Sequence, residues 1–252
     1  MELAKLTWPE AAGVLRSATV AILPIGCTEP HGPHLPLDTD VTIALAQARR
    51  AAEILQESGL HVLVLPALAY GVTNFTDGFA GRLSIQPGTL WALLEDIVVG
   101  LEQHDVRQIV FANGHLEPAH VAVLRGVALD HTERGREKAQ VLFVDVTRRK
   151  LAQQLGDAFM KGDHAGRYET SLVLAADPAA VREDLRARLA PVEVDLVGAI
   201  GRGALHFRDI GLDHAYCGDP ASASADEGHE TIERLARQIA DAAHAAWPEL
   251  FA

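Results

Sequence analysis

Short apolar runs alternate with longer segments of helical spacing in this chain, and this alternation is the strongest constraint on its fold. Four runs have the length and composition of buried strands, at residues 19–24, 61–65, 108–112 and 141–145. Helix-like segments lie between them, at residues 41–58, 89–104 and 118–131. Strands that are apolar throughout are covered on both faces, and helical connections make neighbouring strands parallel. The pattern predicts an α/β fold of three layers, α-β-α, with a mostly parallel central sheet.

The later part of the chain is less regular. Helical spacing predicts helices at residues 169–176, 178–189 and 224–246, whereas the glycine-rich stretch 196–221 reads as loops with a strand around residues 204–207. No stretch has the composition of a linker between domains. We therefore expect one domain that spans residues 1–252.

The composition excludes several classes of function. The net charge is −12, so the surface repels nucleic acids and anionic lipids, and we expect neither nucleic acid nor membrane as a partner. Cys27 and Cys217 are the only cysteines, which fits a reducing compartment and no disulfide framework. The early apolar run at residues 20–27 is too short for a signal peptide or a membrane span. We expect a cytoplasmic protein that acts on a small molecule.

Acidic and imidazole side chains gather directly after two of the expected strands. Residues 29–40 contain Glu29, His31, His34, Asp38 and Asp40, and they follow the first strand. A smaller group follows the strand at residues 108–112 and contains His115 and Glu117. Open parallel sheets bind ligands beyond the carboxyl ends of neighbouring strands. If the two strands are neighbours, these groups meet in space.

Together these side chains have the chemistry of a metal site. Glu29, His31, Asp40, His115 and Glu117 offer mixed nitrogen and oxygen ligands, which suit Zn²⁺, Mn²⁺ or Fe²⁺. Each has an alternative when it is taken alone: Asp40 could cap the helix that begins near residue 41, and Glu117 could stabilise a helix N-terminus. A lone loop histidine usually serves only as a hydrogen-bonding group. The joint pattern favours cations over these separate explanations.

A third group, residues 162–171, contains Asp163, His164 and Glu169. It is either a catalytic loop or an ordinary loop that enters a helix. Cys27 lies near the first group, where a thiol nucleophile is conceivable but simple packing is the more usual role.

These three groups, in this order, resemble the creatininase family of metal-dependent amidohydrolases. The family pattern Gly-x-x-Glu-x-His-Gly-x-His-Leu-Pro-x-x-x-Asp matches residues 26–40. Its Asn-Gly-His matches residues 113–115, and its His-Ala-Gly-x-x-Glu-Thr-Ser matches residues 164–171. The likeness spans about residues 15–245.

The resemblance implies two divalent cations, with Zn²⁺ the leading candidate and Mn²⁺ or Fe²⁺ as alternatives at one site. By this likeness Glu29 and His115 would bind one ion, and His31 and Glu117 the other. Asp40 would bridge the two ions. His164 would act as an acid or oxyanion partner, with Asp163 or Glu169 orienting it or moving protons. A layered α/β fold and a homohexamer are also implied.

The function predicted from these residues is hydrolysis of a C–N bond, other than a peptide bond, in a linear or cyclic amide. Many relatives have glycine where Glu117 stands and an acid where Arg167 stands, which leaves the second ligand set open. The tryptophans that enclose creatinine in creatininase have no counterpart just before His164. The alternatives are a deformylase or a peptidase on the same scaffold, a non-catalytic metal-binding protein, and a cysteine hydrolase that uses Cys27.

Overall fold

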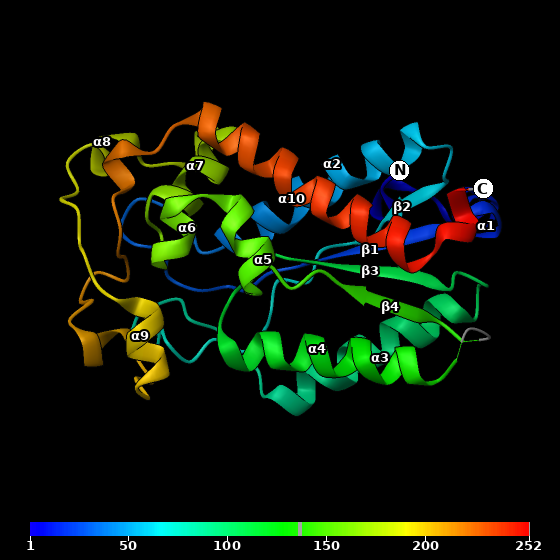
Figure 1. Cartoon of the computed structure of the whole chain (residues 1–252), viewed down its shortest axis with the longest axis horizontal. Coiled ribbons are helices and arrows are strands. Elements are labelled where there is room, and N and C mark those ends of the chain that lie inside the picture. Colours follow the sequence, from blue (N-terminus) through cyan, green and yellow to red (C-terminus); the bar gives the residue numbers. More distant parts are fainter. Residues whose placement is uncertain (136–137, 252) are drawn as a thin grey trace.

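A four-stranded parallel sheet forms the centre of the computed structural model, which describes residues 1–135 and 138–251 (Figure 1). Its strands are β1 (Val20–Ile25), β2 (Val62–Val64), β3 (Gln108–Asn113) and β4 (Gln140–Phe143). They lie in the order β2-β1-β3-β4, and every neighbouring pair is parallel. All four strands predicted from apolar runs are therefore present, with bounds shifted by one or two residues.

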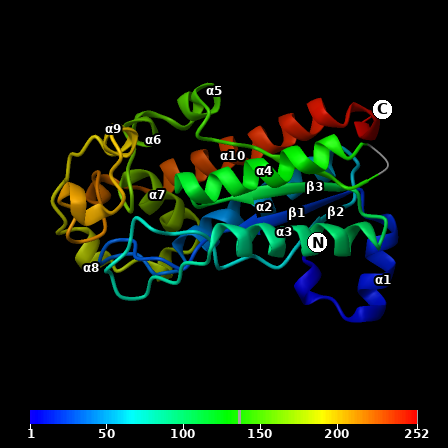
Figure 2. The same ribbon diagram turned by 90° about the horizontal axis from the view of Figure 1, so that it is seen from below.

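Helices cover both faces of this sheet, which confirms the three-layer α/β architecture (Figures 1 and 2). One face packs against α2 (Thr39–Glu57) and α10 (Ala225–Ala246), and the other against α3 (Pro87–Glu102) and α4 (Pro118–Glu133). The alternation of side chains along a strand explains why β1 is apolar throughout. Val20 and Ile22 face the first pair of helices, while Ala21 and Leu23 face the second pair.

The chain from residue 149 to residue 222 gathers beyond the carboxyl ends of the strands, at the left of Figure 1, whereas both termini lie at the opposite end. Its helices are α5 (Arg149–Ala152), α6 (Asp157–Lys161), α7 (Arg167–Ala176), α8 (Glu183–Arg186) and α9 (Leu196–Gly201). Among them α7 packs against α10 and α2. This packing carries the third polar group towards the edge of the sheet where the first two groups lie.

Two of the expected elements do not form as predicted, and the stretch 196–221, predicted to form loops, contains the short helix α9. The predicted helix at residues 178–189 is broken into a 3-10 turn, Pro178–Ala180, and the short α8. Val181 between them is extended and buried, and the amide of Arg182 donates to the carbonyl of His34, so a tertiary contact interrupts the helix. The strand expected around residues 204–207 does not form, because the Phe207 amide donates to the Phe75 carbonyl instead of to a sheet.

An additional helix, α1 (Trp8–Ser17), precedes the first strand. Its N-terminus has a capping box in which Thr7 and Glu10 satisfy each other's backbone amides.

In the described part of the chain, no helix is both long enough and apolar enough to cross a membrane.

Asp145 ties the turn after β4 together. Its carboxylate accepts from Nε of Arg125 at 2.6 Å, from Nε of Arg148 at 2.9 Å and from the Thr147 amide at 3.1 Å. Burial acts to raise the pKa of Asp145, but the hydrogen bonds from Arg125 and Thr147 outweigh it, so the pKa is lowered.

Replacing Asp145 by Asn should therefore weaken the fold in a pH-dependent way. A lowered native pKa stabilises the fold above the unfolded value, about 3.9, and this contribution is lost as the pH falls through the native pKa. We expect Asp145→Asn to lose about 1–3 kcal/mol of unfolding free energy at neutral pH. Urea unfolding of both proteins across the acid range should show this deficit shrinking below about pH 4. A deficit that does not change with pH would contradict this role.

Candidate active site

The loops that follow β1 and β3 begin side by side, because Ile25 and Asn113 are register partners in adjacent strands. The Gly114 amide donates to the Ile25 carbonyl at 2.8 Å, and a Cβ at Gly114 would lie only 2.2 Å from the carbonyl oxygen of Asp40. Glycine therefore allows the β3 loop to approach the first turn of α2. The prediction that the two acid–imidazole groups meet is confirmed.

Asp40 lies between two imidazoles at the centre of this junction. Its Oδ1 is 3.1 Å from Nε2 of His31, and its Oδ2 is 3.0 Å from Nδ1 of His115. Within the described residues, neither oxygen of Asp40 has a hydrogen-bond partner, and neither has Nε2 of His31, although all three atoms are buried. The N-cap of α2 is Asp38, so capping does not account for Asp40.

The outer nitrogens of both imidazoles are held by backbone carbonyls. Nδ1 of His31 is 3.1 Å from the Glu29 carbonyl, and Nε2 of His115 is 2.9 Å from the Val72 carbonyl. A carbonyl only accepts, so each of these nitrogens carries the proton in the neutral ring. Nε2 of His31 and Nδ1 of His115 are then left with lone pairs that point towards Asp40, as in metal-binding histidines.

Two further carboxylates complete the arrangement. Glu29 places Oε1 at 3.2 Å from Nδ1 of His115, and Oε2 accepts from the hydroxyls of Thr73 and Thr76. Glu169, on the first turn of α7, places Oε2 at 3.7 Å from Nε2 of His31 and accepts from the Ala165 amide at 2.6 Å. Two of the buried donor groups share Asp40, namely Glu29–Asp40–His115 and His31–Asp40–Glu169, and a third combines Glu29, His31 and His164.

The electrostatics of the junction favour added positive charge. Burial disfavours the charged form of His31, but Asp40 and Glu169 outweigh it and raise the pKa of His31 to about 10. Burial also acts to raise the pKa of Asp40, but His31 and His115 hold it well below its usual range. Buried carboxylates without compensating charge are costly. Divalent cations can supply that charge in place of protons on the two imidazoles, so the residues present fit a pair of ions.

Glu117 lies outside those two groups, at the start of α4. Its carboxylate accepts from the amide and side chain of Asn74 and from the amide of Phe75 at 3.2 Å, and its pKa is raised by burial. The segment that carries Thr73, Asn74 and Thr76 thus donates hydrogen bonds to the carboxylates of both Glu29 and Glu117.

His164 and Asp163 lie next to the junction. Nε2 of His164 donates to the Pro30 carbonyl at 2.9 Å, while Nδ1 is 3.9 Å from Oε2 of Glu169, and the rings of His31 and His164 are 4.5 Å apart. Burial lowers the pKa of His164. Asp163 accepts from the Tyr168 amide at 2.7 Å, and burial together with Glu169 raises its pKa well above the usual value.

Two adjoining cavities open at the junction. The smaller, of about 80 Å³, is lined by Glu29, His115, Glu117, Asp163, His164 and Glu169, among others. The larger, of about 560 Å³, shares four lining residues with it, namely Phe75, Glu117, Pro118 and Ile200. Arg82, Ala204, Leu205 and His206 line only the larger one. Together they form one site with a narrow polar end and a wide outer part.

Cys27 is fully buried beside His115 but outside both cavities. Burial raises the pKa of its thiol to about 12. A buried, protonated thiol is a poor nucleophile, so the geometry offers no support for a cysteine hydrolase.

A parallel α/β sheet with buried acid–imidazole groups at its carboxyl edge defines the chain as an α/β protein with a candidate metal site. The family model for creatininase, described as creatinine amidohydrolase, matches residues 4–243. The chain belongs to the creatininase family and is accordingly a metal-dependent amidohydrolase.

Individual relatives carry two different activities. The mycofactocin precursor peptide peptidase of Mycobacterium tuberculosis is 37% identical over 222 residues, which cover 85% of this chain and 80% of that protein. The creatinine amidohydrolase of Pseudomonas putida is 32% identical over 196 residues, which cover 71% and 73%. A solved structure described as creatininase Mn is 26% identical, covers 98% of each chain and has a TM-score of 0.73. Another creatininase structure, 25% identical, is described as of Zn–Zn type, with 98% of each chain covered and a TM-score of 0.72.

Proposed function

We propose that this chain hydrolyses the C–N bond of an amide at two cations that share Asp40. Glu29, Asp40 and His115 would hold one ion, and His31, Asp40 and Glu169 the other. The observation that carries the proposal is the buried Asp40 carboxylate, which faces an imidazole with each oxygen and has no hydrogen-bond donor in the described chain. This assignment gives Glu169 the place that the family resemblance gave to Glu117.

The donor set of two imidazoles and three carboxylates suits Zn²⁺ at one position and Zn²⁺, Mn²⁺ or Fe²⁺ at the other. Creatininase structures described with manganese and with zinc support both ions. Bound cations of this kind supply Lewis acidity, which lowers the pKa of water and polarises a carbonyl group.

The protein side of the reaction depends on His164. Its Nε2–H is fixed on the Pro30 carbonyl, so Nδ1 is the nitrogen that can carry a proton towards the small cavity. From there it can donate to the leaving nitrogen of an amide, as a general acid. Glu169 lies 3.9 Å from the same nitrogen and offsets part of the lowering of the His164 pKa by burial, while Asp163 fixes the start of α7 through the Tyr168 amide.

The cavities favour an extended substrate. The smaller cavity, of about 80 Å³, has the carboxylate and imidazole lining, so it would hold the reacting amide. The rest of the substrate would lie in the larger cavity, which is of the size that binds drug-sized ligands. Trp8, Trp91 and Trp247 line neither cavity, so a tryptophan enclosure for a flat ring such as creatinine is missing.

The larger cavity and the lack of a tryptophan enclosure support a second candidate reaction, cleavage of a peptide bond. It stands beside the non-peptide amide hydrolysis expected from the sequence. The peptidase relatives favour it too. A deformylase reaction has no comparable support from the cavities. A metal-binding protein without activity would be the correct description if ions bind but no amide is cleaved. We keep a homohexamer and a cytoplasmic location as predictions from the sequence and the family resemblance.

Metal content discriminates between the two possible ligand sets, one with Glu169 and the other with Glu117. Wild-type protein, stripped and reloaded with Zn²⁺, should contain two equivalents by elemental analysis. Glu169→Gln should contain about one, because a neutral amide is a weak ligand for this ion. Glu117→Gln is the matched control and should keep two. The reverse result, with loss in Glu117→Gln and none in Glu169→Gln, would restore the ligand set implied by the family resemblance.

Filling the larger cavity should discriminate between substrates by size. Ala204 lines that cavity and not the small one, so Ala204→Trp should obstruct the outer part of the site alone. In a panel of creatinine, small linear amides and N-blocked tripeptides, read by mass spectrometry, wild type should cleave tripeptides. Ala204→Trp should lower kcat/KM for these by about tenfold or more, which corresponds to about 1.4 kcal/mol. Cleavage of creatinine alone, unaffected by the substitution, would contradict an extended substrate.

A further inference from the structure

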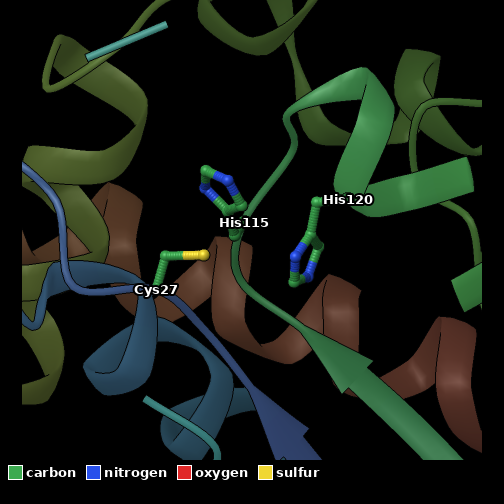
Figure 3. A group of neighbouring side chains, drawn as sticks. All are labelled: Cys27, His115 and His120. Carbon is green, nitrogen blue, oxygen red and sulfur yellow. The ribbon is translucent and has the colours of Figure 1, made fainter. Parts of the chain in front are cut away.

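His120 is a buried imidazole that the proposed reaction does not use. It lies on the first turn of α4 and has no exposed surface. Figure 3 shows it next to His115, with Cys27 on the other side of His115. The rings of His115 and His120 are 4.8 Å apart and nearly perpendicular, at 78°.

Both ring nitrogens of His120 have defined partners. The amide of Val72 donates to Nδ1 at 3.3 Å, and Nε2 is 3.1 Å from Oδ1 of Asn113. An amide nitrogen only donates, so Nδ1 must accept and Nε2 must carry the proton. One neutral tautomer of His120 therefore satisfies both contacts.

Each of these partners also holds His115. The carbonyl of Val72 lies 2.9 Å from Nε2 of His115, and Oδ1 of Asn113 accepts from the His115 amide at 3.2 Å. His120 is thus linked to the ring of His115 through Val72 and to the backbone of His115 through Asn113. It touches neither cavity, so it does not contact substrate.

The segment that links His120 to His115 through Val72 is tightly packed. A Cβ at Gly71 would lie 2.4 Å from both Sγ of Cys27 and Nδ1 of His120, so the segment that leads into Val72 is tightly enclosed between them. Cys27, His115 and His120 have donor atoms close enough together for an ion. Both nitrogens of His120 are already engaged, however, which favours a supporting role over that of a ligand.

We propose that His120 is a positioning residue for His115. By fixing Val72 and Asn113, it holds the His115 ring in the tautomer and orientation that present Nδ1 to the ion shared with Glu29 and Asp40. The inference rests on the proposed cation pair. Partners of this kind behind a metal ligand are typically worth 10–100-fold in affinity.

The test compares four variants, three at His120 and one at His131, by their affinity for Zn²⁺, measured by competition with a chromogenic chelator, and by urea unfolding of the metal-free proteins. His120→Leu should bind one of its two ions about 10–100-fold more weakly and the other with unchanged affinity. His120→Asn keeps an acceptor for the Val72 amide, so it should recover part of that loss.

His131→Leu is the matched control for the general cost of changing a buried histidine on α4. His131 is also fully buried, and it lies near Glu95 at 2.9 Å and the Ala139 carbonyl at 3.3 Å, away from the cation groups. It should lose folding stability and keep both ion affinities.

Wild-type affinities for both ions in His120→Leu would overturn the inference, as would an equal loss in His131→Leu. If His120→Leu does not fold, wild-type affinities in His120→Asn and in His120→Gln together would overturn it. A wild-type protein that binds fewer than two ions would instead contradict the proposed function itself. Three ions in wild type and two in His120→Leu would make His120 a ligand and also overturn the positioning role.

Discussion

The shared carboxylate of Asp40 is the interaction on which the site depends. A buried acid that faces one imidazole with each oxygen, without hydrogen-bond donors in the described chain, is costly unless positive charge lies nearby. The fold places it there by joining β1 directly to α2 through a loop that carries Glu29 and His31. Gly114 then lets the loop after β3 approach Asp40 closely enough to add His115. The cost of burying these charges is understandable if two cations are the missing partners.

The surrounding structure gives each ligand one orientation. Backbone carbonyls fix the proton on the outer nitrogen of His31 and His115, and threonine hydroxyls hold the outer oxygen of Glu29. Such fixed ligands bind an ion without a further loss of side-chain freedom. The segment around Val72 and Asn74 contributes to several of these contacts at once. It joins the proposed ligands to the wall of the larger cavity, so the proposed metal centre and substrate site share one segment of the chain.

Much of this could be predicted from the sequence because the relevant signals are local. Buried parallel strands are continuous apolar runs, and the residues that follow them lie at one edge of the sheet. Glu29, Asp40 and His115 could therefore be expected to meet.

The position of Glu169 could not be derived in this way, because it depends on how α7 packs against α2 and α10. The contacts of Val72, Thr73 and His120 have no sequence signal of their own, since they depend on an irregular loop. The helix expected at residues 178–189 does not form as one element, because the Arg182 amide donates to the His34 carbonyl in a distant loop. A tertiary contact of this kind also has no local sequence signal. The single domain over residues 1–252 stays a prediction.

Anomalous diffraction from crystals grown with Zn²⁺ and measured at the zinc absorption edge tests the central claim most directly. The account predicts two strong peaks, one on each side of the Asp40 carboxylate, with Glu29 and His115 next to one and His31 and Glu169 next to the other. A single peak, or zinc at Cys27 with none beside Asp40, would contradict it.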